Sequence, residues 1–411
     1  MSQNAYEKTS AIAACARPEP VGATENRHTE RPSTGRLIGV DLARGLAVFG
    51  MYAAHVGPDP AQGGTTGFLM ELGHGRASAL FAFLAGFSIM LVTGRRTPKS
   101  GRAGRQAVAK IVIRALILLA VGTALTLYGT PVDVILAFYG LFFLLVLPLH
   151  RLSAGPLMVI ASVGALVLPQ LLYAVQHVLA TREPGGIWTW PADADGILSL
   201  LFTGGYPALA WLPFVIAGMA VARLDLAATA VRIRLAITGL GLAVLGHGGS
   251  WLALHMVPGA MSAIAWSDGA EGGPVSSAWW SDTWGYPAVG TPQTLLVASP
   301  HSETTLSILA NTGVAIVVLA GCLAAVDAFP RFHRLARPVI AVGSMSLTAY
   351  ILHVIAIGML GIEELPGSPL YVLLAFVVAI AAFAMLWSRL LRRGPFEWLL
   401  GLATKPAELI R

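Results

Sequence analysis

The sequence has little charge. Asp, Glu, Lys and Arg make up 12% of its 411 residues, whereas soluble domains carry about 25%. Hydrophobic residues reach 55%, so a soluble core of this composition would lack the polar surface needed to cover it. An ordinary soluble domain is therefore excluded, and long segments in contact with lipid are indicated.

Cysteine is almost absent too. Cys15 lies near the N-terminus and Cys322 within an apolar run, so neither a disulfide nor a cysteine metal site is expected. No Walker-type phosphate loop occurs, and no stripe of basic residues is interleaved with aromatics. We therefore predict no metal, no nucleotide-loop chemistry and no nucleic-acid partner.

Long apolar runs account for the composition. Each is long enough to cross a hydrocarbon core of about 30 Å. We predict an all-α, polytopic transmembrane helix bundle in a lipid bilayer, with about ten membrane-spanning helices. The predicted spans are 37–56, 77–94, 107–128, 132–149, 155–180, 197–222, 233–256, 304–326, 338–360 and 369–391.

Basic residues are distributed unevenly among the connections. Alternate connections and the two terminal segments together hold 24 of the 27 Lys and Arg residues, whereas the other connections hold only Arg76 and Arg182 and most of the acids; Arg44 lies within a helix. The positive-inside rule then places both termini in the cytoplasm. We predict a disordered cytoplasmic tail at 1–36, a membrane domain at 37–393 with a long outer loop at 257–303, and a cytoplasmic tail at 394–411.

The first predicted helix contains three ionisable residues, Asp41, Arg44 and His55. Such groups are costly inside a membrane and normally face the protein interior or a wet cavity. Arg44 and His55 are eleven residues apart, so they project within roughly 20° of one another and lie roughly 16 Å apart along the helix. Asp41 precedes Arg44 by three and can pair with it. A structural pair and an interfacial histidine remain the alternative interpretations.

The ninth predicted helix carries a second imidazole. Ser346, Tyr350 and His353 have the spacing i, i+4, i+7 and share a face. His353 falls in the outer half of its helix, at a depth similar to that of His55. The alternative is a hydrogen-bonded set that holds helices together.

The motifs of the sequence together resemble those of a known superfamily of transmembrane acyltransferases. The Arg44-x10-His55 spacing resembles the hallmark of bacterial transmembrane acyltransferases that O-acetylate cell-surface sugars, and residues 36–47 are similar to the start of the heparan-α-glucosaminide N-acetyltransferase-like family. Further similar segments are His74–Gly86, Leu136–Gly140, Tyr206–Trp211, Pro300–Ser302, Ser346–His353 and Gly394–Trp398. Their order and spacing, more than any single motif, carry the resemblance.

The resemblance implies an enzyme of a bacterial plasma membrane. It would transfer an acyl group, with acetyl-CoA as the expected donor, from the cytoplasmic side to a hydroxyl or amine of an extracytoplasmic, sugar-like acceptor. Two other functions remain open: a transporter or flippase of a lipid-linked or small anionic molecule, and a non-enzymatic partner subunit. The sequence is also compatible with a homo-oligomer.

For the acyltransferase function that the resemblance implies, the candidate residues fall into three groups. The catalytic candidates are His55, Arg44, Asp41 and His353, with His55 as general base or acyl carrier. The acceptor candidates are Tyr350, Ser346, His74, Arg76, His301, Trp211 and Tyr206, with Glu303 beside His301. The candidates for binding the CoA phosphates are Arg95, Arg96, Arg102, Arg105, Lys110 and Arg114, for which simple positive-inside topology is the alternative.

The outer loop at 257–303 contains Trp266, Trp279, Trp280, Trp284 and Tyr286. Flat aromatic side chains suit sugar rings, so this loop is a candidate lid or acceptor platform. The alternative is an aromatic belt at the membrane interface.

Overall fold

The computed structural model describes residues 38–181, 196–267, 275–281, 291–391 and 393–410. The predicted tail at 1–36 and the aromatic residues Trp284 and Tyr286 lie outside these ranges. Within them the chain forms α-helices joined by short turns, and no strand. The helices are α1 (Ile38–Val56), α2 (Gly64–Gly73), α3 (Arg76–Thr93), α4 (Gly101–Leu127), α5 (Ile135–Val146), α6 (Ala154–Thr181), α7 (Ala208–Ala222), α8 (Thr229–Met256), α9 (Ala260–Ser267), α10 (Thr305–Ala328), α11 (Pro330–Leu335), α12 (Arg337–Ser344), α13 (Ser346–Leu360), α14 (Leu370–Leu390) and α15 (Pro395–Ala403).

The all-α, polytopic membrane fold is confirmed. Six helical segments are long and apolar enough to span a bilayer, or seven if a bent pair counts as one span. The six are Gly64–Thr93, Gly101–Leu127, Ala154–Val178, Thr229–Met256, Thr305–Ala328 and Leu370–Leu390. Each of the ten predicted spans has a helical counterpart, but α5 and α7 are shorter apolar helices. The count of ten and the orientation remain predictions.

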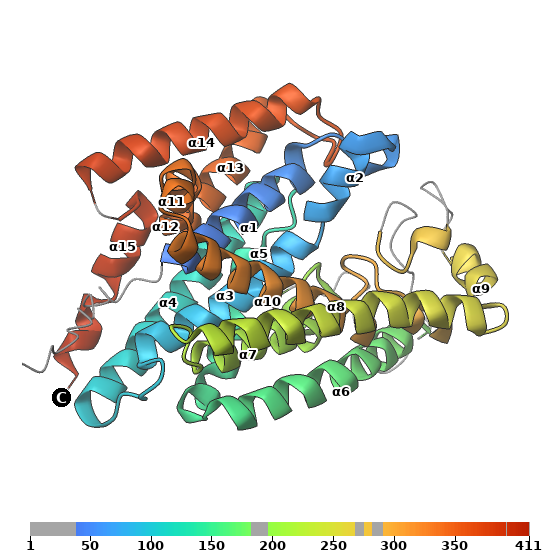
Figure 1. Ribbon diagram of the computed structural model, residues 1–411, viewed down its shortest axis with the longest axis horizontal. Helices are drawn as coiled ribbons and strands as arrows, with labels where there is room; N and C mark the ends of the chain where they lie inside the picture. Colours follow the sequence, from blue (N-terminus) through green and yellow to red (C-terminus); the bar gives the residue numbers. More distant parts are fainter. Residues whose placement is uncertain (1–37, 182–195, 268–274, 282–290, 392, 411) are drawn as a thin grey trace, which may run out of the picture. The chain divides into compact units, whose positions relative to one another are not determined.

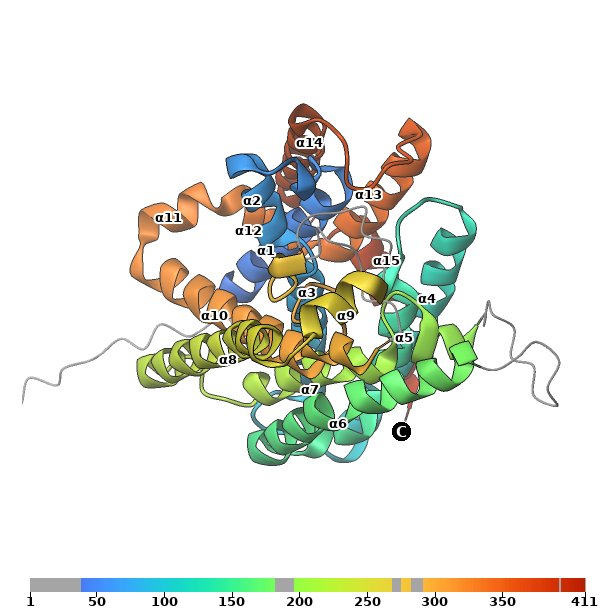
Figure 2. The ribbon, with the colours of Figure 1, turned by 90° about the vertical axis from the view of Figure 1, so that its right-hand side faces the viewer.

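α1 lies at the centre of the helical unit. It packs against α3 and α10 on one side and against α12, α13 and α14 on the other (Figures 1 and 2). By contrast α6, α8 and α14 leave most of their apolar side chains exposed, as expected for helices at a lipid-facing periphery. The ionisable residues of α1 are therefore held inside the protein.

α1 and α12 cross with their backbones almost in contact, because both carry glycine at the crossing. A methyl group added at Gly343 would lie 1.7 Å from the carbonyl oxygen of Asp41. One added at Gly45 would lie 2.1 Å from the carbonyl oxygen of Val339. Small residues allow such close approach between helices in lipid.

The predicted span at 338–360 is not a single helix. α12 ends at Ser344, α13 begins at Ser346, and the two axes differ by 87°. The free N–H groups at the start of α13 are capped by Glu397 of α15, whose Oε1 accepts from Leu347 N at 2.8 Å and Thr348 N at 3.1 Å. A carboxylate at a helix N-terminus also complements the helix dipole. An acidic residue fifty positions away therefore satisfies the backbone at the break.

Candidate functional site

The predicted pair in α1 is present. Arg44 Nη1 lies 3.1 Å from Asp41 Oδ1, and Arg44 Nη2 donates to Ser88 Oγ of α3 at 2.6 Å. Asp41 is 4% exposed and the Arg44 side chain 20% exposed. Pairing lowers the cost of burying both charges and fixes the guanidinium between α1 and α3.

The two predicted histidines meet. His55 Nδ1 of α1 lies 2.9 Å from His353 Nε2 of α13, and the rings stack with an interplanar angle of 18°. His353 is 2% exposed, whereas His55 is partly exposed. Sequence reasoning placed both at a similar depth but gave no reason for direct contact between segments 298 residues apart.

Two tyrosines hold His353 in place. The Tyr52 hydroxyl of α1 donates to the Ala349 carbonyl at 2.8 Å, and its ring centroid lies 4.7 Å from that of His353. Tyr350 packs edge-on at 5.0 Å, while its hydroxyl accepts from Ile135 N of α5. Predicted as an acceptor residue, Tyr350 thus also anchors the pair to α5. Ser346 lies two helical turns earlier, at the start of α13, and is partly buried.

The contact between the two imidazoles links their protonation. If His55 Nδ1–H donates, His353 Nε2 accepts, and His55 Nε2 is left with a lone pair that can take a proton from a hydroxyl or amine. His353 then stands where a carboxylate stands in many catalytic dyads, orienting the base without touching the substrate. The geometry therefore fits a histidine pair in which His55 is the reactive member.

Further predicted residues lie near His55. His74, which follows α2, and His301, which precedes α10, lie close enough to interact electrostatically with it. The His301 ring lies 5.5 Å from that of Tyr206 and 5.7 Å from that of Trp211. Three segments that are remote in sequence thus bring four acceptor candidates near His55.

The loop that carries His301 is strained. His301 and Glu303 have φ values of 55° and 58°, which only glycine adopts freely. Gly75 beside His74 has a φ of 62°, and a methyl group there would lie 2.3 Å from Pro300 Cβ. Strained backbone of this kind persists where the surroundings enforce it, commonly at functional sites.

Glu303 is the acidic residue beside His301 and Trp211. Trp211 Nε1 donates to Glu303 Oε1 at 3.4 Å, and both residues line a cavity of about 10 Å³, enough for about one water molecule. Burial raises the pKa of the Glu303 carboxyl well above its usual 4.5, and the Trp211 hydrogen bond lowers it by less. The carboxyl group is therefore neutral at pH values where an exposed Glu is ionised.

A raised pKa in the folded state predicts how stability depends on pH. The contribution of Glu303 is complete below its unfolded pKa of about 4.5 and is lost as pH rises through the folded value. Wild type should lose up to about 1.4 kcal/mol per pH unit over that range relative to Glu303→Gln. Thermal unfolding of both proteins between pH 4 and 8 measures this, and parallel curves would contradict it.

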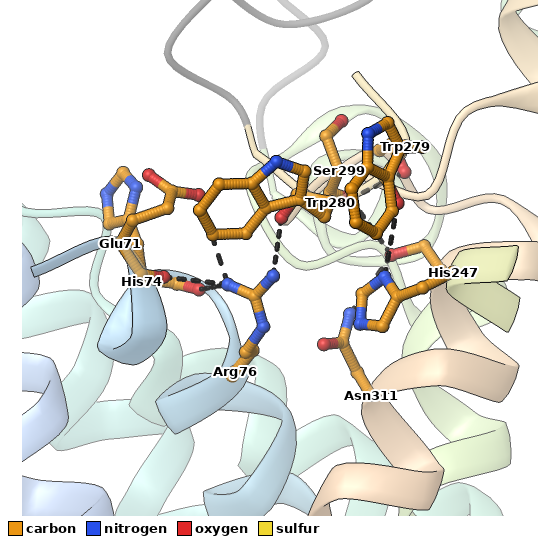
Figure 3. A network of polar contacts seen from close by, with 10 residues as sticks. Glu71, His74, Arg76, His247, Trp279, Trp280, Ser299 and Asn311 are labelled. Atoms are coloured by element: carbon orange, nitrogen blue, oxygen red, sulfur yellow. Dashed lines mark hydrogen bonds and ion pairs between the residues drawn. The ribbon is translucent and has the colours of Figure 1, made fainter. Parts of the chain in front are cut away.

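Arg76 is engaged by the protein itself. Its guanidinium donates to the carbonyl groups of Glu71 and Trp280, lies 3.9 Å from the Glu71 carboxylate and lies over the Trp280 ring at 5.8 Å (Figure 3). His247 of α8 contacts the Trp279 carbonyl at 3.1 Å in the same network. Predicted as an acceptor residue, Arg76 here fastens the loop segment at 279–280 to the start of α3. No sequence motif indicated that Glu71 and His247 would contribute to this network.

The basic candidates divide into two groups. Arg95 donates to the carbonyl groups of Ala222 and Leu224, and Arg96 pairs with Asp225 at 3.3 Å, so both lie at the end of α7. The α4 group instead faces the segment after α15. Arg102 donates to the Ile410 carbonyl at 3.1 Å, and Lys110 Nζ lies 2.8 Å from Glu408 Oε1. The Lys110 contact lowers the pKa of the exposed Glu408 carboxyl.

Arg105 and Arg114 lie on the same helix as Lys110. Arg105 is exposed in the first turns of α4. Arg114 is partly buried, and its Nε makes no hydrogen bond within the described ranges. Elsewhere in the described part of the chain, no three His, Cys, Asp or Glu side chains converge to form a metal site.

Two known families match parts of the chain. Residues 36–249 match the family described as heparan-alpha-glucosaminide N-acetyltransferase, catalytic, which is more than half of the chain. The chain belongs to this family of membrane acetyltransferases. Residues 283–405 also match a family described as a protein of unknown function (DUF418), and no curated protein matches the chain. His55 lies in the acetyltransferase match and His353 in the second, so both matched regions supply one member of the histidine pair.

Proposed function

We propose that this membrane acetyltransferase-family protein transfers an acyl group from cytoplasmic acyl-CoA to a hydroxyl or amine of an extracytoplasmic, sugar-like acceptor. One arrangement of side chains around His55 carries the proposal. His55 contacts His353 at 2.9 Å, faces a polar cluster on its outer side and shares a helix with the buried Asp41–Arg44 pair. Acetyl, from acetyl-CoA, is the acyl group that the family description favours, and the plasma membrane is the expected location.

The histidine pair supplies the base. The acceptor oxygen or nitrogen attacks the thioester carbonyl carbon while His55 Nε2 takes its proton. The C–S bond then breaks, and the imidazolium returns the proton to the CoA sulfur as the thiol leaves. A relay in which His55 first carries the acyl group uses the same atoms in two steps.

Arg44 is suited to steady the donor. The guanidinium lies on the cytoplasmic side of His55 in the predicted orientation, roughly 16 Å away along α1. That separation is comparable to an extended pantetheine arm, so a donor whose phosphates lie near Arg95 and Arg96 would present its thioester to His55. The outer aromatic residues Tyr206 and Trp211 would then stack on the acceptor ring.

The test uses purified protein in lipid nanodiscs with radiolabelled acetyl-CoA, alone and with simple sugars and amino sugars. We expect label transfer or thioester cleavage in wild type and a loss of about 10²- to 10⁴-fold in His55→Ala. Failure of wild type to bind or consume any acyl-CoA would overturn the proposal, and a transporter would then be the better explanation.

A further inference from the structure

The Gly394–Trp398 segment is one of the motifs that carry the family resemblance, and the proposed reaction gives it no role. It begins α15 and lies against the break between α12 and α13 (Figure 1). Gly394 is buried there, and a methyl group added to it would lie 2.5 Å from Met345 Cβ. Pro395 is the first residue of α15, a position at which its missing N–H costs no helix hydrogen bond. The motif therefore brings the backbone of α15 close to the break.

Two residues of the motif form hydrogen bonds with the first turn of α13. Glu397 Oε1 accepts from Leu347 N and Thr348 N, and Oε2 accepts from Thr348 Oγ1 at 2.5 Å. Phe396 N in turn donates to Thr348 Oγ1 at 3.1 Å. Thr348 is 0% exposed, so water does not replace these partners when they are lost. Met345, the residue before the helix, contributes no side-chain cap of its own.

The first turn of α13 determines where His353 lies. Met345 alone separates α12 from α13, so the direction of α13 depends on the contacts that hold its first turn. The two tyrosine contacts described above hold the next turn, and His353 lies about 8 Å beyond Thr348 along the helix axis. The His353 Nε2 atom is 2.9 Å from His55 Nδ1, so a displacement of about 1 Å would break this contact.

We propose that Glu397 is a positioning residue for acyl transfer: its carboxylate fixes the first turn of α13 and thereby places His353 against His55. The inference rests on the proposed function and adds a residue that acts in it without touching the substrate. Three hydrogen bonds to one carboxylate fix both the position and the rotation of the helix start. A misplacement of about 1 Å can cost on the order of 10²-fold in rate. Loss of the cap therefore lowers kcat through His353 and leaves binding of the acyl donor unchanged.

The test compares variants in nanodiscs, with kcat and KM for acetyl-CoA measured on monodisperse protein. Glu397→Gln keeps the length of the side chain and one oxygen that can accept from both backbone N–H groups, whereas Glu397→Asp keeps the charge but is one methylene group shorter. Thr348→Val removes only the hydroxyl contacts and decides the question if Glu397→Ala does not fold. Asp327→Ala is the matched control, because Asp327 is an exposed acid at the end of α10 that pairs with Arg232 of α8 at 2.6 Å.

We expect Glu397→Ala and Glu397→Asp to lower kcat by roughly 30- to 100-fold, with KM changed by less than about twofold. Glu397→Gln should recover at least about tenfold over Glu397→Ala, and Asp327→Ala should behave as wild type. Thr348→Val should lower kcat by about tenfold, since it loses only part of the contact. In a His353→Ala protein, Glu397→Ala and Glu397→Asp should cause no further loss, because both changes remove the same contact.

Two results would overturn this inference and leave the acyltransferase proposal intact. One is wild-type kcat in folded Glu397→Asp and Thr348→Val. The other is a loss that persists in full on the His353→Ala background, because Glu397 would then act by another route. A wild type that uses no acyl-CoA would overturn both proposals.

Discussion

Alanine at either His55 or His353 should lower kcat by about 10³-fold, and replacing both should cost no more than the worse single change. The reason is the 2.9 Å contact between the two rings. If His353 fixes the tautomer of His55, removal of either residue removes the same base. The kcat losses of the two single variants therefore do not add in the double variant. Single-turnover acyl transfer by the three variants in nanodiscs measures this directly.

Two further variants distinguish positioning from simple packing. His353→Gln keeps an amide that can accept from His55 Nδ1, so it should recover at least tenfold over His353→Ala with little change in KM. His255→Ala changes an exposed histidine at the end of α8 that contacts the carbonyl and the ring of Trp251 in its own helix, and should behave as wild type. Additive losses in the double variant would show that His353 does not act through His55.

Alanine at Gly343 should prevent folding or lower stability by at least about 3 kcal/mol. Its methyl group would lie 1.7 Å from the Asp41 carbonyl oxygen, and the obstacle is backbone, which cannot move aside as a flexible side chain can. The α1–α12 crossing would have to open, and the ion pair next to it would move. Thermal unfolding of detergent-solubilised protein, followed by loss of the monodisperse chromatographic peak, measures the effect.

Gly321 of α10 provides the matched control. It lies within a helix, but a methyl group there would meet no atom within 4 Å. Gly321→Ala should therefore be neutral or stabilising by up to about 1 kcal/mol, through helix propensity alone. Equal melting temperatures for the two variants would show that the close crossing does not limit stability.

The parts of the fold that sequence predicted depend on local chemistry. Apolar runs imply helices in lipid, and the spacing of Asp41 and Arg44 implies a pair on one face, because helix geometry alone sets both. The similar depth of His55 and His353 followed in the same way. Whether the aromatic residues at 279–280 form a lid remains a prediction.

Other parts depend on contacts between remote segments, which periodicity does not encode. The run at 338–360 is long and mostly apolar and was therefore predicted as one span, without the break at Met345. The cap on that break comes from Glu397, which a pattern-based interpretation placed in a cytoplasmic tail. The contacts of Arg102 with Ile410 and of Lys110 with Glu408 were likewise not predicted, and the role of both residues in binding CoA phosphates stays a prediction.

The cap on α13 also has a consequence for biogenesis. Two backbone N–H groups at the start of the helix that carries His353 are satisfied by a carboxylate synthesised fifty residues later. While the ribosome is still translating α14, this end of α13 has no such acceptor, and an unsatisfied amide is costly away from water. We therefore expect the start of α13 to reach its final hydrogen bonding only after α15 has emerged and docked, which would make assembly of the histidine pair a late event of membrane insertion.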